Sequence, residues 1–548
     1  GRGPRQQDAA RAMTMTETIA RGGEAGGDTL ARFARAESQR RAWDALLDEA
    51  YRYALPNHAT HAQQGRGERR DREVYDATAV NAVQWKKARL HGQLFPPFRA
   101  WMDFEAEPRA LDSVLAGGLG GELGAALADP ALARRWQLYL ADARAKFHAA
   151  IEASNFHIEI DPALAEACIS TGCILVQAGA PEAPLAFEAV PLAQLVPEEA
   201  ADGTIRTLFR RRRVKPEEVA LLWPDASLPA EIKSAASRGA RELELIEALL
   251  HEPPHHNGAD GSTRYELWLP AAASGGRLLL TRRYEVSPAI VFRMDKAPGE
   301  ALGRGPVLNV LGDIKTANKV VELVLKNASI AVTGIWQAED DGVLNPANVR
   351  LVPGAVIPKA VGSAGLTPLA PPGRFDVSQL VLAGLQESIR RGIMGPSLPP
   401  ADERGRTAFE IDQRVAEREA VELPMSLRLL SELDRPLARR VLAILMAPAM
   451  AGSPDYIAPF EADGRRLAPR PSSPLIRLQD RAEAAAAQRA YLAAAAAFPD
   501  LVGAVVNRAR YLRDFLARNG FPPEHLSAPG LDAAGLASSG LAEIVEQE

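Results

Sequence analysis

Two short phrases in the sequence carry the residue types of a metal site. His251-Glu-Pro-Pro-His255 matches the letters of the zinc-protease motif H-E-x-x-H. That motif binds zinc only when both histidines lie one turn apart on a helix, and the two central prolines prevent that helix. Cys168 and Cys173 are the only cysteines and have no second cysteine pair to complete a zinc set. We interpret them as a buried thiol pair, and we predict no metal and no cofactor.

The signatures of the common enzyme classes are also missing. Gly303-Arg-Gly305 lacks the Lys-Ser/Thr that would make it a phosphate-binding loop. The sequence has no G-x-S-x-G nucleophile elbow and no D-F-G set. We therefore predict that the chain is not an enzyme. The alternative from another class is a cytoplasmic enzyme or binding module with an unrecognised small-molecule site in its β-rich lobe.

A run of four arginines, Arg210 to Arg213, invites a DNA-binding interpretation. It ends a strand-like segment, so alternation places some of these arginines on an exposed sheet face. We favour a solvated or interface-pairing role over DNA binding. The formal net charge of -5 also argues against a protein that coats nucleic acid with cations.

Length and composition set the class of protein. A chain of 548 residues with 47% hydrophobic and 24% charged residues is long enough for several folded subdomains. Two cysteines imply no disulfide framework and favour a reducing compartment. No apolar run reaches the roughly 18–20 residues that span a bilayer, and no signal-peptide core is present. We expect Met13 or Met15 to be the natural start.

The rest of the chain is organised around residues 303–407. The phrase Gly303-Arg-Gly-Pro306 predicts a tight turn and then a helix to about Val332. Trp336 to Gly373 is rich in proline, glycine and β-branched residues, which predicts short strands and turns. A second helix is predicted from Phe375 to Met394. The apolar stripe of the first helix recurs at three-four spacing: Ile314, Ala317, Val320, Val321, Val324, Leu325 and Ala328.

A polar loop separates this pair of helices from a third. Residues 395–406 contain several prolines and glycines and are predicted to be irregular. Thr407-Ala-Phe-Glu410 is a capping-box pattern that predicts the start of a long helix towards Met446. Pro424 should kink that helix, and Pro436 is a second point of interruption.

Outside this region the pattern alternates between helices and strands. We expect an amphipathic helix from Thr29 to Leu55 and another from Thr78, capped by Asp76 or Thr78, to Leu94. Pro96 and Pro97 end that helix. Further helices are predicted at 123–154, 162–170, 215–223, 477–498 and 501–518, and strands at 173–176, 185–190, 205–213, 242–252, 264–269 and 277–284.

This order of elements, together with Tyr75-Asp-Ala-Thr78, Leu94-Phe95-Pro96 and Trp101, resembles the portal proteins (head-to-tail connectors) of short-tailed bacteriophages. The resemblance implies an α+β, mainly α, fold: a helical stem, a small β-rich clip, an α/β wing and a helical C-terminal crown. Along the chain it implies a disordered segment at 1–28 and a wing at 29–302, which is helical over 29–170 and β-rich over 171–302. The stem helices are 303–334 and 374–394, with the clip at 335–373 between them, and the tunnel loop is 395–406. A long kinked wing helix at 407–447 is followed by the crown at 448–525 and a flexible tail at 526–548.

The resemblance also implies a function and partners. Portal subunits form a closed ring, usually of twelve copies, at one capsid vertex of the virion, and they are assembled in the host cytoplasm. Double-stranded DNA passes through the ring non-specifically during packaging and ejection. The implied protein partners are the terminase large subunit, the major capsid and scaffolding proteins and the tail adaptor proteins, with no membrane.

Three groups of residues are assigned roles by the same resemblance. Tunnel-loop residues that face passing DNA are Asp402, Glu403, Arg404 and Arg406. Stem charges left for the lumen, for pairs between subunits or for the outer collar are Lys315, Lys319, Lys326, Arg390 and Arg391. Clip residues expected to contact partners are Trp336, Glu339, Asp340 and Asp341; a clip that only locks subunits together is an equal alternative.

Overall fold

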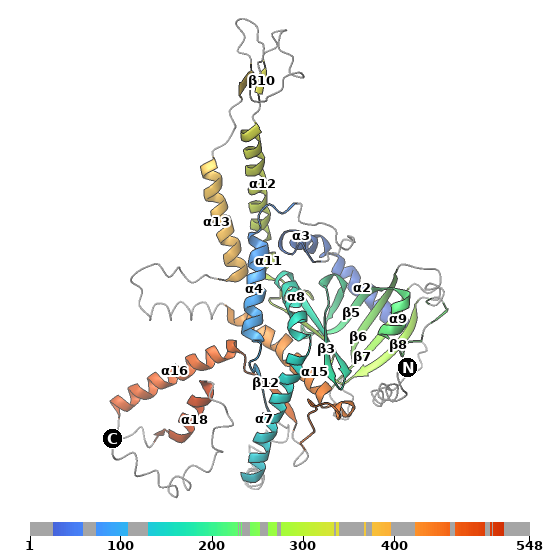
Figure 1. The fold of residues 1–548 in the computed structure, drawn as a ribbon, viewed down its shortest axis with the longest axis vertical. Coiled ribbons are helices and arrows are strands. Elements are labelled where there is room, and N and C mark those ends of the chain that lie inside the picture. The colour runs from blue at the N-terminus through green and yellow to red at the C-terminus, as the bar shows by residue number, and fades with distance from the viewer. Residues whose placement is uncertain are drawn as a thin grey trace. The chain divides into compact units, whose positions relative to one another are not determined.

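The structure is a computed structural model. It describes residues 26–58, 73–107, 130–227, 229–230, 232, 242–252, 261–270, 276–333, 336–338, 366–368, 375–395, 422–460, 466–498, 505–506 and 508–519. Two compact units make up the chain. The first combines Gly1–Asp44, Lys86–Gly305 and Glu419–Glu548, and the second combines Ala45–Trp85 and Pro306–Arg418. The elements confirm the predicted α+β class, mainly helical (Figure 1).

The first unit contains an antiparallel sheet of five consecutive strands (Figure 1). They are β4 (Leu195–Glu199), β5 (Ile205–Val214), β6 (Leu243–Glu252), β7 (Ser262–Leu269) and β8 (Arg277–Tyr284). Helix α2 (Gly26–Arg41) covers one face, where Phe33 packs edge-on against Phe209 at 5.7 Å between ring centroids. Ile246, Ala248 and Leu250 join this core from alternate positions of β6, as the period of two along a strand requires. The strands predicted between 205 and 284 are confirmed.

A smaller sheet lies in the same unit, in the order β3-β2-β9. Its strands are β2 (Thr171–Ala180), β3 (Ala183–Ala189) and β9 (Ala289–Arg293). Helix α8 (Phe156–Ile169) packs against β2 and β3, and α15 (Arg435–Leu445) also contacts both strands. The buried Arg440 of α15 donates to the carbonyls of Val176 (3.1 Å) and Val286 (3.3 Å), so this arginine fastens the helix to the sheet.

An aromatic cluster lies beside a two-stranded antiparallel ribbon of the first unit. The ribbon pairs β1 (Met102–Ala106) with β12 (Leu467–Pro471), and helix α7 (Pro130–Ala153) contacts β1. Trp101 is fully buried and meets Phe95 at 4.8 Å and Phe147 at 5.7 Å between ring centroids. Phe95 and Trp101 are therefore core residues. The Trp101–Phe95 and Trp101–Phe147 ring pairs are both edge-on, which is a favoured geometry for aromatic pairs.

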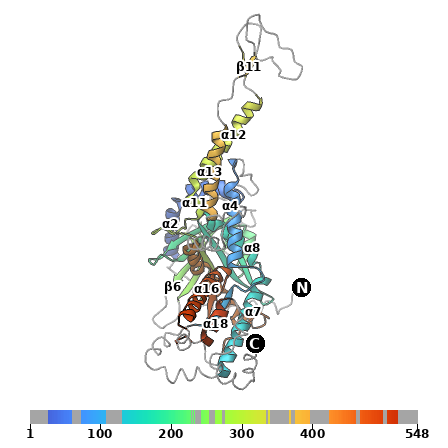
Figure 2. The same cartoon turned by 90° about the vertical axis from the view of Figure 1, so that its left-hand side faces the viewer.

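The remaining elements of the first unit are short or C-terminal. They are η2 (Leu192–Gln194), α9 (Pro216–Leu222), η5 (Pro448–Met450), α16 (Pro474–Ala497) and α18 (Arg508–Arg518). Helices α16 and α18 lie side by side in both views, with Tyr491 stacked on Tyr511 at 5.0 Å (Figures 1 and 2). Of the helix predicted at 501–518, residues 508–518 form α18, residue 506 before it is a bend, and residues 501–504 lie outside the described residues.

The second unit is mostly helical. It holds α3 (Asp44–Ala54) from Ala45 onward, α4 (Thr78–Leu94) as far as Trp85, α11 (Pro306–Asn309), α12 (Leu311–Thr333) and α13 (Phe375–Met394). Strands β10 (Trp336–Ala338) and β11 (Leu366–Pro368) pair antiparallel between α12 and α13 in the chain. The helix predicted from Phe375 to Met394 has those bounds, and the short strands predicted after Trp336 are present.

One helix prediction needs correction, and the interruption predicted at Pro436 is present. The single helix predicted from Thr29 to Leu55 is two helices, α2 and α3, separated by a turn at Ala42 and Trp43. Of the long helix predicted from Thr407 towards Met446, the structure describes the part from residue 422 onward, which contains a π-helical turn, η4 (Leu430–Asp434), ending two residues before Pro436. Proline has no N–H, so the usual bond to the carbonyl four residues earlier cannot form there. The N–H of Arg435 instead donates to Leu430, five residues back.

Candidate functional site: the helical hairpin and its anchors

Helices α12 and α13 form a hairpin whose base is tightly packed. The two helices lie side by side in both views (Figures 1 and 2). At the base Ile314, Ala317 and Ile389 are buried, and the Ser388 hydroxyl donates to Asp313 across the pair at 2.7 Å. A Cβ added at Gly392 would lie 2.3 Å from Val310, so glycine is needed for this close approach.

Further along the hairpin the apolar side chains are left open. Exposed fractions are 49% for Leu323, 52% for Leu325, 78% for Leu380 and 49% for Val381. Within the predicted stripe of α12, Ile314 and Ala317 are buried and Leu325 is exposed, while the other positions are half-buried. Leu323 and Leu325 are two residues apart and therefore lie on different sides of α12, so the exposed apolar side chains are not confined to one face.

The five stem cations are all paired with carboxylates within this unit. Lys315 reaches Glu49 at 2.9 Å, and Lys319 and Lys326 share Glu322 at 3.0 Å and 2.5 Å. Hydrogen bonds from Lys326 and Lys319 lower the pKa of Glu322. Arg390 and Arg391 lie 3.7 Å and 3.9 Å from Glu387. The hairpin of a single chain thus carries alternating charge rather than a row of unpaired cations.

The segment before α4 is fastened to α12 by one asparagine. The side-chain oxygen of Asn318 accepts from the N–H groups of Tyr75 (2.7 Å) and Asp76 (3.1 Å). Its amide nitrogen donates to the carbonyl of Glu73 at 2.8 Å. Asp76 in turn accepts from the N–H of Thr78 (3.2 Å) and its hydroxyl (2.7 Å), so Asp76 is the capping residue of α4. The sequence predicted the cap but gave no signal for Asn318.

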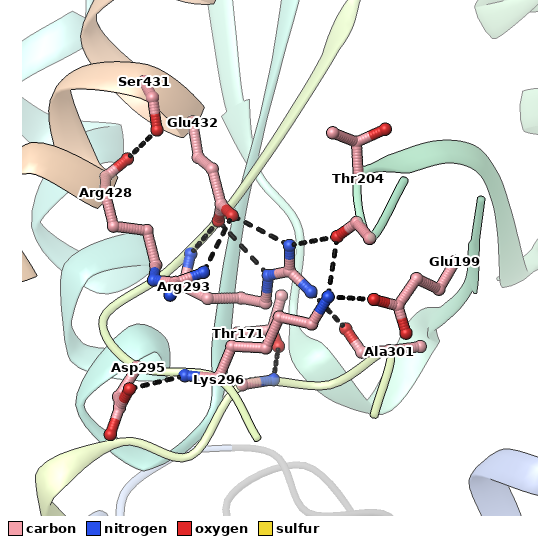
Figure 3. Close-up of polar contacts among 12 residues, drawn as sticks. Thr171, Glu199, Thr204, Arg293, Asp295, Lys296, Ala301, Arg428, Ser431 and Glu432 are labelled. Atoms are coloured by element: carbon pink, nitrogen blue, oxygen red, sulfur yellow. Dashed lines mark hydrogen bonds and ion pairs between the residues drawn. The ribbon is translucent and has the colours of Figure 1, made fainter. Parts of the chain in front are cut away.

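In the first unit a buried arginine joins three separate segments of the chain. Arg293, at the end of β9, is 2% exposed. Its N–H, Nε and Nη2 all donate to the Glu432 carboxylate, at 2.9, 3.2 and 2.8 Å (Figure 3). Arg293 also donates to the carbonyls of Ala301 and Gly203, both at 3.2 Å. This bidentate pair joins β9, the β4–β5 turn and η4.

Lys296 adds a second link to the same turn. Its Nζ donates to the Gly203 carbonyl at 2.8 Å and also pairs with Glu199 (Figure 3). Gly203 has φ +78°, a left-handed conformation that suits glycine. Its carbonyl thereby receives two cationic donors, from Arg293 and Lys296. The site is a structural junction, because the buried charges meet one another rather than an open surface.

Gly303 and Gly305 serve close packing rather than the predicted tight turn. Neither has a positive φ. A Cβ on Gly303 would lie 2.5 Å from the Ser170 carbonyl, and one on Gly305 would lie 2.2 Å from the Cys168 carbonyl. Gly303 donates to Thr171 at 2.9 Å, and Gly305 donates to Ile169 at 2.9 Å. Only glycine allows the 303–305 segment to lie this close to residues 168–171.

The π-turn that carries Glu432 has an unusual buried acid beside it. Asp434 is fully buried, and neither carboxylate oxygen has a hydrogen-bond partner among the described residues. Burial raises the pKa of Asp434 well above its usual value.

Some of the other predicted site residues lie in the described part of the chain, and others lie outside it. Tunnel-loop residues Asp402, Glu403, Arg404 and Arg406 and clip residues Glu339, Asp340 and Asp341 lie outside the described residues. Trp336 is the first residue of β10. His251 and Glu252 end strand β6, so the start of the H-E-x-x-H phrase is extended rather than helical. Across the described ranges, no group of three His, Cys, Asp or Glu residues could hold a metal ion.

The four consecutive arginines of β5 all meet carboxylates. Arg210 donates to Glu188 at 2.5 Å, and Arg211 donates to Glu37 at 2.7 Å. Arg212 lies 3.6 Å from Glu188, and Arg213 lies 4.0 Å from Glu244. These contacts support the pairing role that we favoured over DNA binding.

Both cysteines are buried free thiols, and burial raises the pKa of Cys168 and of Cys173 to about 12. No helix in the described part of the chain is both long and apolar enough to cross a membrane.

The first unit thus contains a junction of buried ion pairs, and the second unit contains a helical hairpin with exposed apolar side chains. A family profile described as "Bacteriophage head to tail connecting protein" matches residues 27–526. The chain belongs to this family, whose members are structural components of the phage particle, and its location is therefore the virion.

Two of the solved structures that contain similar chains come from gene transfer agent particles. One is "Virion of native gene transfer agent (GTA) particle", with 13% identity, TM-score 0.28 and coverage of 81% of this chain and 99% of that one. The other is "Neck of empty GTA particle computed with C6 symmetry", with 12% identity, TM-score 0.28 and coverage of 78% and 96%. Both superpose loosely on this chain. No curated protein matches it.

Proposed function

We propose that this chain is the portal subunit of a phage particle and forms a closed ring at one capsid vertex. The observation that carries the proposal is that the hairpin of a single chain exposes large apolar side chains, Leu323, Leu325, Leu380 and Val381, in a chain of the head-to-tail connecting family. A ring needs heterologous interfaces, in which one face of a subunit meets a different face of its neighbour. The exposed hairpin leucines supply such a face, and twelve copies are the expected number.

Double-stranded DNA enters and leaves through this ring. DNA carries about one charge per 1.7 Å of axis, so a lumen that gripped phosphates at many points would resist its motion. Neutralised stem cations fit this requirement, because Lys315, Lys319 and Lys326 already have carboxylate partners. The mixed charges of Asp402, Glu403, Arg404 and Arg406 would make weak, sliding contacts with the passing duplex.

Other proteins would meet the ring at separate places. The segment 335–373, with Trp336 and the acidic Glu339, Asp340 and Asp341, would bind the terminase large subunit during packaging and the tail adaptor proteins afterwards. Residues 29–302 would contact the major capsid and scaffolding proteins. The chain itself would perform no catalysis and need no cofactor, and the packaging ATPase would be a different protein.

Ring formation tests the proposal directly. We expect purified wild-type protein to give rings with a central hole by negative-stain microscopy. Leu323→Asp, Leu380→Asp, Val321→Asp and Leu385→Asp should each leave monomers or aggregates, because a buried unpaired carboxylate costs several kcal/mol. Thr316→Asp is the control, since Thr316 is exposed on the same helix. Rings of unchanged mass in all four variants, measured by mass photometry, would show that the hairpin is not the interface.

A further inference from the structure

One buried arginine of the first unit has no counter-charge. Arg440, on α15, is only 7% exposed. Within the described part of the chain, no carboxylate forms an ion pair with it. Arg210 and Arg293 are as deeply buried, yet each donates to a carboxylate, at 2.5 Å and 2.8 Å. Charged side chains are almost never buried without such a partner, because removing a charge from water is costly.

The contacts that Arg440 does make hold its guanidinium but do not neutralise it. Nε donates to the Val176 carbonyl at 3.1 Å, and Nη1 donates to the Val286 carbonyl at 3.3 Å. The guanidinium also lies over the Tyr284 ring, 5.0 Å from its centroid. Carbonyl dipoles and an aromatic face attract a cation without carrying a negative charge. Burial lowers the pKa of Arg440, but an arginine still keeps its proton at neutral pH.

The third nitrogen of the guanidinium, Nη2, is available to a ligand. No described residue accepts a hydrogen bond from it. Nη2 is not fully buried, so this edge of the guanidinium remains open to solvent. Because Nε, Nη1 and the Tyr284 ring already fix the group, little side-chain freedom is lost when Nη2 gains a partner.

The charges around Arg440 favour an anion as that partner. Helix α15 contains no acidic residue. Arg435 and Arg439 are exposed on it, and neither forms an ion pair with a described residue. Glu285, which precedes Val286, is exposed and makes no ion pair with Arg440. The three arginines therefore give this helix a positive potential that attracts anions from solution.

We propose that Arg440 is the anchor of a binding site for a small oxyanion, with Nη2 as the donor. An anionic oxygen accepts from Nη2 in a charge-assisted hydrogen bond and neutralises the buried cation. Phosphate carries more negative charge than a carboxylate at neutral pH, so phosphate should bind more tightly. The exposed Arg439 has no comparable site, because its charge is already hydrated and its side chain must be ordered on binding. The site lies within one chain, so it does not depend on ring formation.

Calorimetric titration of the full chain at pH 7.5 and constant ionic strength is the test. Inorganic phosphate and acetate are the two probes, and chloride supplies the ionic strength. We expect wild-type protein to bind phosphate saturably, with one site per chain, and acetate more weakly. Arg440→Gln should lower the phosphate affinity at least about tenfold, as for the loss of a hydrogen bond between charged groups. Arg439→Gln, the adjacent exposed arginine, is the matched control and should bind phosphate within about twofold of wild type.

Two outcomes would overturn the site. One is a wild-type protein that shows no saturable binding of either oxyanion, a result that needs no variant to fold. The other is a folded Arg440→Gln protein that binds phosphate as tightly as the wild type, which would assign the binding to exposed arginines such as Arg439. If Arg440→Gln does not fold, selenate, a tetrahedral oxyanion like phosphate, replaces the variant. Its selenium, located by anomalous scattering in a crystal of the wild type, should place an oxygen within hydrogen-bond distance of Nη2, and selenate found only elsewhere would contradict the proposal.

Discussion

Asn318 binds Tyr75 through its side-chain oxygen, which accepts the Tyr75 N–H at 2.7 Å across 243 residues of sequence. The same side chain also satisfies the N–H of Asp76 and the carbonyl of Glu73. Asn318 is 6% exposed, so water cannot replace these three bonds. One residue of the hairpin therefore fixes the chain that enters α4.

Replacing Asn318 should weaken the second unit. Asn318→Ala leaves buried backbone groups unpaired, and we expect the free energy of unfolding to fall by about 1–3 kcal/mol in urea denaturation. Asn318→Asp keeps the acceptor for Tyr75 and Asp76 but sets a second carboxylate oxygen against the Glu73 carbonyl, so it should also be destabilising. Asn327→Ala, further along the same helix, is the control. Equal unfolding free energies for Asn318→Ala and Asn327→Ala would show that the hydrogen bonds of Asn318 do not stabilise the second unit.

Removing the tunnel loop should affect DNA rather than assembly. Deletion of Pro399 to Gly405 should leave rings intact but reduce retention of packaged DNA, because contacts there are electrostatic and non-specific. The measurement is in vitro packaging with nuclease protection at two salt concentrations, with Lys315→Ala, a paired stem cation, as the control. If the deletion variant packages and retains DNA as the wild type does at both salt concentrations, the loop takes no part in DNA retention and is only a hinge.

Local patterns predicted the regular elements well. The bounds of α13 follow from its apolar spacing, and those of β8 follow from a short run between turn residues. Both signals lie within a few residues of the chain. The anchors could not be predicted in this way, because Arg293 and Glu432 are 139 residues apart and neither stands in a recognisable motif.

Tertiary contacts explain the helix break that the sequence did not reveal. Residues 29–55 have the apolar spacing of a single helix, yet the chain turns at Trp43. The guanidinium of Arg304 lies over the Trp43 ring, 4.9 Å from its centroid. A distant cation thus holds this aromatic residue at the turn, and such contacts override helix propensity.

The Arg293–Glu432 pair should carry much of the stability of the first unit. Glu432→Gln leaves a buried guanidinium without its carboxylate, and we expect the free energy of unfolding to fall by about 3–5 kcal/mol. The double variant Arg293→Met/Glu432→Leu should recover most of this loss, since no buried charge remains unpaired. Arg206→Ala, which breaks an exposed pair with Asp202, is the control and should change little. A Glu432→Gln protein as stable as the control would contradict this role.

Glu166 should make the stability of the first unit fall as pH rises. Burial raises its pKa from 4.5 to about 8, although a hydrogen bond from the Leu192 backbone opposes the shift. The folded state therefore keeps a proton that the unfolded state releases above about pH 4.5. Wild-type stability should decline between pH 4.5 and about 8 and then level off, by a few kcal/mol in total. Glu166→Gln cannot ionise and still accepts from Leu192, so its advantage over wild type should grow across this window. Denaturant unfolding at pH 5, 6.5 and 8 measures the difference. A constant difference between the two proteins would show that Glu166 is already ionised in the folded chain.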